Sequence, residues 1–229
     1  MELNFLGNGS GFTDKHTNAF YEYDGKLVFI DLSMLNIQKA LKIQENYSDV
    51  NIIVTHMHDD HVSGIGLFAQ YLFYCYHKKL KIFVPNNLFD DMQTEMRIKG
   101  INMTIIELNK VDKGILGIEN VIETNHAPEL KGKCFGYLFK LNDKLIVYTG
   151  DTCKLEDFES YLKDCNEFYV DCSYNYGGVH LKWSNVKEKL IEFSKRMSVY
   201  LMHIDNEDIK VEVEDLKNEK LKVVEIIEL

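Results

Sequence analysis

The chain has 229 residues, 45% hydrophobic and 27% charged, a composition typical of a soluble globular protein with a sizeable core. Its net charge of −10 argues against a general affinity for nucleic acid but does not exclude a small anionic ligand. No apolar stretch is long enough for a membrane span, and the N-terminus lacks the layout of a signal peptide. The five cysteines show no paired spacing, so we expect reduced thiols and a cytoplasmic location.

The first part of the chain predicts strands, a hairpin and one helix. Asp24-Gly25 is a strong turn signal between two apolar runs, and the expected elements are a strand at 3–6, a turn at 7–11, a hairpin of strands at 19–24 and 27–32, and a helix at 36–46. Asp31 lies at the end of the second hairpin strand. A carboxylate there either caps the strand end or supports a metal ligand.

The most informative stretch is NIIVTHMHDDHVSG, residues 51–64. Its apolar residues predict a buried strand, which runs directly into His56, His58, Asp60 and His61. If the extended conformation continued, the period of two would place His56, His58 and Asp60 on one side of the chain. Three imidazoles and a carboxylate within six residues suit a borderline cation such as zinc in an open, water-bearing site.

Strands and helices alternate in the remainder without a repeat or a linker. We expect helices at 61–78, 86–99, 154–163, 185–195 and 207–219, and strands at 81–85, 103–107, 115–124, 133–141, 144–149, 167–172, 198–202 and 223–227. This order predicts sheets covered by helices in a single α/β domain spanning residues 1–229.

Three further residues of the metal-ligating type follow predicted strands. His126, Asp151 and His203 each lie where a scaffold of strands would deliver side chains to a common edge. Singly, each is more often an ordinary polar residue at a strand end. Together with the HxHxDH stretch they supply seven ligands, enough for two metal ions that share one carboxylate.

The order HxHxDH, His, Gly-Asp-Thr and a late strand-end His resembles the metallo-β-lactamase superfamily of dinuclear zinc hydrolases. The resemblance covers nearly the whole chain and implies an αββα sandwich with the metals at one edge. It implies the following roles: His56, His58 and His126 on one metal, Asp60, His61 and His203 on the other, Asp151 bridging, and Asp31 supporting the ligands from behind.

Details of the chain are similar to the ribonuclease Z-like branch of that superfamily. The opening LGNGSGF resembles the first strand and turn of this branch, and YVDCSYN followed by His180 resembles two of its later segments. Asp171 stands where the branch has Glu, and His180 is followed by Leu-Lys-Trp rather than Ser-Thr. The pair is either a general acid with its orienting carboxylate or an unrelated surface histidine near Trp183.

The tRNA-processing members of this branch carry a long arm between the positions of His126 and Asp151, and this chain has no room for one. We therefore expect a compact phosphodiesterase that hydrolyses small phosphodiesters, such as cyclic nucleotides or cyclic ribose phosphates, through a metal-bridging hydroxide. In this scheme Asp60, His180 and Asp171 are the catalytic residues and the cofactors are two divalent ions, zinc or manganese. The resemblance also implies a homodimer.

Two other functions stay open on the sequence alone. A lactonase or thioesterase could use the same scaffold, with less need for His180. A catalytically silent protein that binds nucleotides through its metals, as a sensor, is the second alternative. Neither long nucleic acid nor a membrane is an expected partner.

Overall fold

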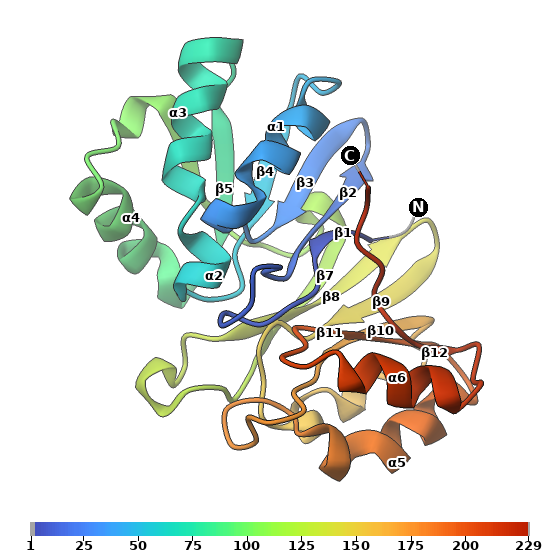
Figure 1. Ribbon diagram of the computed structural model, residues 1–229. Helices are drawn as coiled ribbons and strands as arrows, with labels where there is room; N and C mark the ends of the chain where they lie inside the picture. Colours follow the sequence, from blue (N-terminus) through green and yellow to red (C-terminus); the bar gives the residue numbers. More distant parts are fainter. Residues whose placement is uncertain (1–2, 229) are drawn as a thin grey trace.

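The computed structural model describes residues 3–228 and consists of two six-stranded sheets that face each other between layers of helices (Figure 1). The strands of the first sheet are β1 (Asn4–Gly7), β2 (Asn18–Tyr23), β3 (Lys26–Ile30), β4 (Val50–Ile53), β5 (Leu80–Val84) and β6 (Ile106–Lys110). Those of the second are β7 (Ile118–Glu123), β8 (Phe135–Leu141), β9 (Lys144–Tyr148), β10 (Glu167–Asp171), β11 (Ser198–Met202) and β12 (Leu221–Val223).

The two sheets have the same internal plan. In each sheet, three consecutive strands form an antiparallel meander, and the third of these begins a parallel run of four strands. In a parallel run, the carboxyl ends of the strands meet at one edge, where ligands bind in open α/β sheets. Strands β3 and β4 of the first sheet and β9, β10 and β11 of the second belong to these runs.

The alternation of side-chain directions along the strands explains how the layers pack against one another. In β3, Leu27 and Phe29 pack toward the helices, whereas Val28 and Ile30 belong to the cluster between the two sheets. Because successive side chains of a strand point to opposite faces, a strand buried on both faces must be apolar throughout. The layer between the sheets is rich in aromatic rings, including Tyr21 and Phe139, whose centroids lie 5.5 Å apart.

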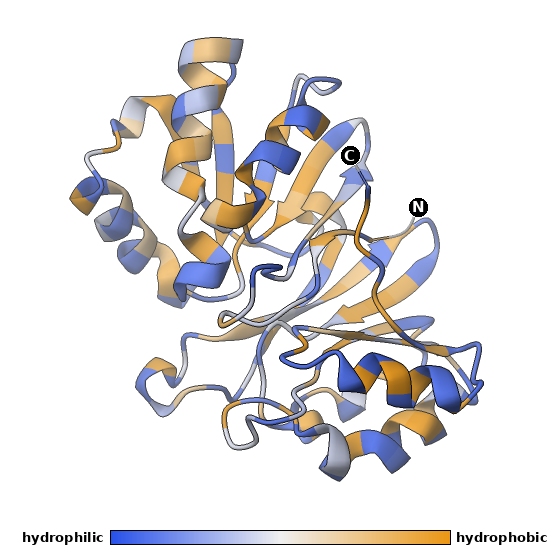
Figure 2. Cartoon of the chain, viewed as in Figure 1, coloured by the Kyte–Doolittle hydropathy of each residue, from blue (hydrophilic) through white to orange (hydrophobic). Residues whose placement is uncertain are grey.

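Helices cover the outer face of each sheet. The α-helices are α1 (Ile37–Gln44), α2 (Asp59–Val62), α3 (Ile65–Tyr76), α4 (Phe89–Ile98), α5 (Trp183–Ser194) and α6 (Asp208–Asp215). The first four lie on the side of the first sheet and the last two cover the second (Figure 1). Figure 2 shows hydrophobic residues concentrated in the strands and alternating with hydrophilic ones along the helices, as amphipathic covering helices require.

The predicted αββα sandwich is confirmed, and most predicted elements are present. The hairpin at Asp24-Gly25 forms as expected, and Asn142 and Asp143 both adopt positive φ in the turn between β8 and β9. The region 61–78 was expected to be one helix, but it is interrupted between α2 and α3. Gly64 lies at this break, where a Cβ would come within 2.6 Å of the carbonyl oxygen of Ser33.

Three other predicted elements are wrong in detail. Residues 154–163 form two short 3-10 turns, Leu155–Asp157 and Glu159–Tyr161, instead of one α-helix. The expected strand at 103–107 is mostly a 3-10 turn, and β6 begins only at Ile106. The last strand is Leu221–Val223 rather than 223–227, because its pairing with β11 begins earlier in the chain. No helix among residues 3–228 combines the length and the apolar composition needed to cross a membrane.

The layer between the sheets should contribute strongly to stability. Replacing the fully buried Phe139 with Ala should lower the free energy of unfolding by about 3–5 kcal/mol, because it leaves a cavity between the sheets. Urea denaturation followed by circular dichroism measures this loss. Phe12→Ala is the control, since Phe12 is 87% exposed and its removal should change stability by less than about 0.5 kcal/mol. A loss below about 1 kcal/mol for Phe139→Ala would contradict this assignment of the core.

Candidate metal centre and active site

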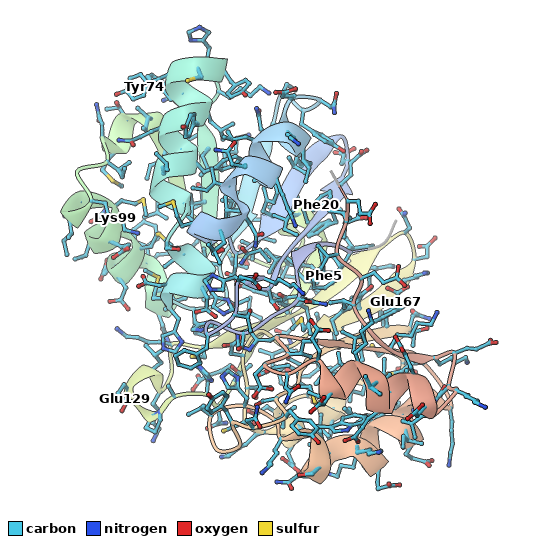
Figure 3. The ribbon with its side chains drawn as sticks, in the orientation of Figure 1. Phe5, Phe20, Tyr74, Lys99, Glu129 and Glu167 are labelled. Atoms are coloured by element: carbon cyan, nitrogen blue, oxygen red, sulfur yellow. The ribbon has the colours of Figure 1, made fainter. Side chains whose placement is uncertain are left out.

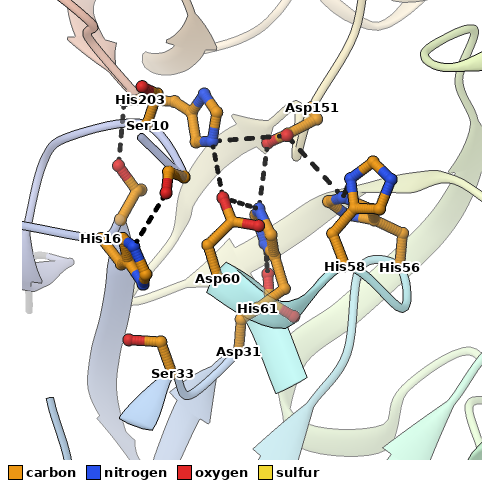
Figure 4. A network of polar contacts seen from close by, with 12 residues as sticks. Ser10, His16, Asp31, Ser33, His56, His58, Asp60, His61, Asp151 and His203 are labelled. Atoms are coloured by element: carbon orange, nitrogen blue, oxygen red, sulfur yellow. Dashed lines mark hydrogen bonds and ion pairs between the residues drawn. The ribbon is translucent and has the colours of Figure 1, made fainter. Parts of the chain in front are cut away.

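The seven candidate metal ligands come from the ends of four strands and converge at one edge of the sandwich. Figure 4 labels all of them except His126. Each lies in the segment that follows β4, β7, β9 or β11. They form two groups whose ligand atoms all lie within 4.8 Å of one another: His56, His58, His126 and Asp151 in the first, and Asp60, His61, Asp151 and His203 in the second.

Asp151 is the residue shared by both groups. Its Oδ2 lies 3.7 Å from Nε2 of His56 and 3.7 Å from Nε2 of His126, in the first group. Its Oδ1 lies 3.4 Å from Nε2 of His61, and its Oδ2 lies 3.4 Å from Nε2 of His203, in the second. A carboxylate whose oxygens lie near ligands of both groups is suited to bridge two cations.

Asp31 orients His61, a member of the second group, through the ring nitrogen that does not face the cluster. Its carboxylate is fully buried and accepts hydrogen bonds from the backbone N–H of Thr55 (2.8 Å) and from the Thr55 hydroxyl (2.7 Å). Its Oδ2 also lies 2.7 Å from Nδ1 of His61. An ionised carboxylate can only accept, so Nδ1 of His61 donates and Nε2 is left facing the cluster.

Two other candidate histidines, His126 and His56, are also oriented through their second ring nitrogen. Nδ1 of His126 donates to the carbonyl oxygen of Val179 at 2.6 Å, which turns Nε2 of His126 toward His58. Nδ1 of His56 lies 3.0 Å from the hydroxyl of Thr55. This type of support fixes the ring orientation and the tautomer of a metal-ligating histidine.

Asp171 contacts two histidines at once. Its Oδ2 lies 2.8 Å from Nδ1 of His180 and accepts a hydrogen bond from the backbone N–H of Thr152 at 2.9 Å. Its Oδ1 lies 3.5 Å from Nδ1 of His203, a candidate metal ligand. The sequence linked Asp171 to His180 only, because the approach of β10 to His203 depends on the pairing of β10 with β11.

The backbone adopts a left-handed conformation at three positions of this edge. Asp31 has φ 60°, His203 has φ 58° and Gly150, the neighbour of Asp151, has φ 58°. For a residue with a Cβ this conformation costs about 1–2 kcal/mol, and such strain is frequent at functional sites. At Gly150 a Cβ would also lie 2.6 Å from the carbonyl oxygen of Phe135, so only glycine fits there.

Several carboxylates lie close together in this region, and their negative charge favours the binding of cations. Burial alone would raise the pKa of Asp151, but His203, His61 and His56 outweigh it and hold the pKa well below its usual value. Burial lowers the pKa of His203, yet Asp151, Asp171 and Asp60 outweigh it and raise that pKa to about 10. Asp151 thus stays ionised and draws positive charge onto His61 and His203.

The donor set fits divalent metal ions. Nε2 of His61 is buried and makes no hydrogen bond, although Asp60 and Asp151 oxygens lie 3.3 and 3.4 Å away. A cation among these atoms would bind this nitrogen and balance both carboxylates. In the first group, burial lowers the pKa of His56 and His58, which keeps both imidazoles neutral and able to ligate.

The expected geometry of the HxHxDH stretch is wrong in one respect. Asp60 does not continue an extended chain from His56 and His58, because α2 begins at Asp59, immediately after His58. Asp60 and His61 therefore project from one short helical turn. This explains how neighbouring residues of the motif reach different groups. Oδ2 of Asp60 lies 3.1 Å from Nε2 of His203, within the second group.

A cavity of about 390 Å³ opens beside the cluster, within the range of small-molecule sites. Six of the candidate functional residues line it: His58, Asp60, His126, Asp151, His180 and His203. His16 also lines it and is half-buried. Within residues 3–228, no Lys or Arg lines this cavity.

Sequence reasoning missed several residues of this cavity. Phe12 and Tyr176 lie at its rim, and Ser173 and Asp205 belong to its wall. Phe12 follows the glycine-rich turn, and Tyr176 follows the segment YVDCSYN, so both belong to stretches that were singled out for other reasons. Nothing in their local pattern distinguishes them from ordinary loop residues.

Comparison with known protein families shows which family the chain belongs to. A family model described as "Anti-Pycsar protein Apyc1" matches residues 1–226. The chain belongs to the Apyc1 family. Members of this family degrade cyclic nucleotides, which agrees at the level of the family with the metal-dependent phosphodiesterase predicted from the sequence.

Similar proteins include both Apyc1 proteins and ribonucleases Z. An Apyc1 protein of Bacillus phage 010DV004 is 25% identical over 230 residues, which cover 89% of this chain and 88% of that protein. The Ribonuclease Z of Listeria welshimeri is 27% identical over 179 residues, 70% of this chain but only 56% of that enzyme. The match therefore spans little more than half of the length of the ribonuclease. The predicted resemblance to the ribonuclease Z-like branch is confirmed.

Solved structures agree on the fold. A diphosphatase from the PhnP family has a TM-score of 0.76 at 16% identity, over 99% of this chain and 97% of that one. Zn(2+)-bound PqqB from Methylobacterium extorquens has a TM-score of 0.74 at 9% identity, over the full length of both chains. Identities this low show the shared fold alone.

The contact between Asp31 and His61 should control metal affinity. In Asp31→Asn the side chain can no longer accept from both Thr55 and His61 as an anion, so His61 loses its fixed orientation. We expect a 10- to 100-fold lower affinity for Zn²⁺, as for other residues that orient metal-ligating histidines. Competition with a chromophoric chelator measures it, with the exposed Asp14→Asn as control. Unchanged affinity in Asp31→Asn would mean that this carboxylate serves only the fold.

Proposed function

We propose that this chain hydrolyses cyclic nucleotides as a metal-dependent phosphodiesterase with two metal ions. The family supports the substrate class, and the seven converging candidate ligands support the two ions. The observation that carries the proposal is the contact of 2.8 Å between Asp171 and His180 at the edge of the cluster. This pair supplies the general acid that hydrolysis of a phosphodiester with an alkoxide leaving group needs.

The proposed metal ligands are those grouped above, with Asp151 shared between the ions. Imidazole and carboxylate donors suit zinc, and manganese is the alternative when oxygen donors dominate. PqqB, which has this fold, is named as Zn(2+)-bound, which supports zinc. Bound divalent ions would supply the Lewis acidity that activates water and offsets charge on the phosphate.

His180 would donate the proton that the leaving group requires. Hydrolysis of a cyclic phosphodiester forms one bond from phosphorus to a water oxygen and breaks one bond from phosphorus to a ribose oxygen. The departing ribose oxygen must gain a proton, and His180 lines the cavity where it departs. Burial lowers the pKa of His180, but Asp171 outweighs this effect and raises the pKa above its usual value, which favours the protonated imidazole.

Asp60 would orient the attacking water. Its carboxylate is held by His61 and His203 and lines the same cavity. Those histidines outweigh the effect of burial and hold its pKa below the usual value, so Asp60 accepts a hydrogen bond from water as an anion. The water would then approach phosphorus from the side opposite to His180.

The charge of the cavity lining supports the proposal that substrate binding and hydrolysis depend on bound metal ions. An anionic phosphodiester would meet carboxylates and, among the described residues, no Lys or Arg side chain. The positive charge that attracts the substrate would come from the bound ions.

A chelator should therefore remove both hydrolysis and binding of a cyclic nucleotide. Chromatography measures the hydrolysis and calorimetry measures the binding. Binding that persists after chelation would contradict it.

A substrate panel tests the proposed function. Metal-loaded protein should hydrolyse 3′,5′-cyclic nucleotides, followed by chromatography of the products, at least about 100-fold faster than a lactone or a thioester. A preference for the lactone would favour the lactonase alternative. Tight binding of cyclic nucleotides without turnover would favour the sensor.

Replacement of His180 tests its proposed role as general acid. His180→Ala should lower kcat for a cyclic nucleotide by about 10²- to 10⁴-fold, and for bis(p-nitrophenyl) phosphate far less, because nitrophenolate leaves without a proton. His77→Asn is the matched control, since His77 is an exposed histidine at the end of α3. Equal losses on both substrates would exclude the role of general acid.

Two further expectations stay predictions. A homodimer rests on the resemblance alone, and light scattering coupled to gel filtration measures it. The cytoplasmic location rests on the unpaired cysteines and awaits fractionation of cells.

A further inference from the structure

Two aromatic rings meet at the rim of the catalytic cavity. Phe12 is 87% exposed and Tyr176 is 49% exposed, yet their ring centroids lie 5.7 Å apart at an interplanar angle of 47°. Both residues line the cavity that contains the candidate ligands. A large apolar ring left in water loses the free energy that burial would provide, so a ligand that covers it gains affinity.

The loop that carries Phe12 is fixed against the metal centre. The N–H of Ser10 donates to the carbonyl oxygen of Ile204 at 3.0 Å, and the N–H of Thr13 donates to that of Ser10 at 3.0 Å. A Cβ on Gly11 would lie 2.9 Å from Oδ2 of Asp60, so the backbone next to Phe12 packs directly on a candidate ligand.

The loop that carries Tyr176 is fixed by Asp205. Its Oδ1 accepts from the N–H of Tyr174 at 2.5 Å, and its Oδ2 accepts from the hydroxyl of Ser173 at 3.0 Å and from the N–H of Asn175 at 2.9 Å. The N–H of Tyr176 then donates to the hydroxyl of Ser173 at 2.7 Å. One carboxylate and one hydroxyl therefore hold the start of this loop.

Both loops are attached to the same short segment of the chain. Ile204, which anchors the loop of Phe12, and Asp205, which anchors that of Tyr176, directly follow the candidate ligand His203. The two rings are thus held at a set position relative to the cluster. This arrangement is what a substrate with a phosphate at one end and a planar group at the other would need.

We propose that Phe12 and Tyr176 form a stacking platform for the base of the substrate, which rests on the proposed function and narrows it. The phosphate would lie at the metal cluster and the base against the two rings at the rim. Stacking on aromatic side chains is a general means of holding a nucleobase. The inference therefore favours cyclic nucleotides over cyclic ribose phosphates, which have no base to cover the rings.

Several polar groups near the two rings are already engaged. Ser173 and Asp205 hold the loop of Tyr176, and Nε2 of His16 lies 3.2 Å from the carbonyl oxygen of Gly11. The faces of the two rings are the apolar contact that this side of the cavity offers to a base, beside the unpaired Oγ of Ser10 and Nδ1 of His16.

The test compares substrates with and without a base. We expect Phe12→Leu and Tyr176→Leu, which keep apolar bulk but lose the ring, to raise KM for cyclic AMP roughly 5- to 150-fold at nearly constant kcat. The same variants should change KM for methyl riboside 3′,5′-cyclic phosphate by less than about twofold, since it has no base to stack. Equal losses on both substrates, or no loss on either, would overturn the proposal.

Matched variants separate stacking from folding. Phe12→Tyr and Tyr176→Phe keep an aromatic ring and should retain the KM of the unaltered protein for cyclic AMP. Tyr74→Leu removes an exposed tyrosine near the far end of α3, away from the cavity (Figure 3), and should have no effect. Failure of the two ring-retaining variants to preserve KM would overturn the proposal.

A binding measurement keeps this inference distinct from the proposed function. The fluorescence of 2-aminopurine riboside 5′-monophosphate, a monoester, falls when its base stacks. Quenching by the metal-loaded protein that is lost in Phe12→Leu and Tyr176→Leu would support the platform even if no cyclic nucleotide were hydrolysed. Hydrolysis of cyclic AMP together with equal quenching by all variants would leave the function standing and remove the platform.

Discussion

The burial of several carboxylates at one edge of the sandwich is the constraint on which this structure depends. Ionised carboxylates in a largely dry site are costly unless cations or hydrogen-bond donors balance them. Here Asp31 faces Thr55 and His61, whereas Asp151 faces histidines of both groups. The first arrangement is satisfied within the chain, and the second calls for divalent cations. The candidate metal centre is therefore a consequence of how charge is distributed over the strand ends.

The local part of this arrangement could be predicted from the sequence. The apolar run at residues 52–54 is followed by polar residues. The pattern therefore predicts that His56 lies at the end of a strand. The same reasoning applied to His126, Asp151 and His203. Period and turn signals act over a few residues, which is the range over which sequence reasoning is dependable.

The parts that could not be predicted depend on contacts between distant segments or on small conformational differences. Asp60 was expected on an extended chain, but a single helical turn begins at Asp59, directly after His58. The contact of Asp171 with His203 requires the register of β10 against β11. The meeting of Phe12 with Tyr176 requires two loops to be fixed to the segment after His203, which no local pattern records.

Location of the bound metals tests the central claim most directly. Anomalous diffraction from crystals grown with zinc should reveal two ions per chain. One ion should contact His56, His58 and His126, the other Asp60, His61 and His203, and Asp151 should contact both. A single ion, or ions bound away from these residues, would contradict the account.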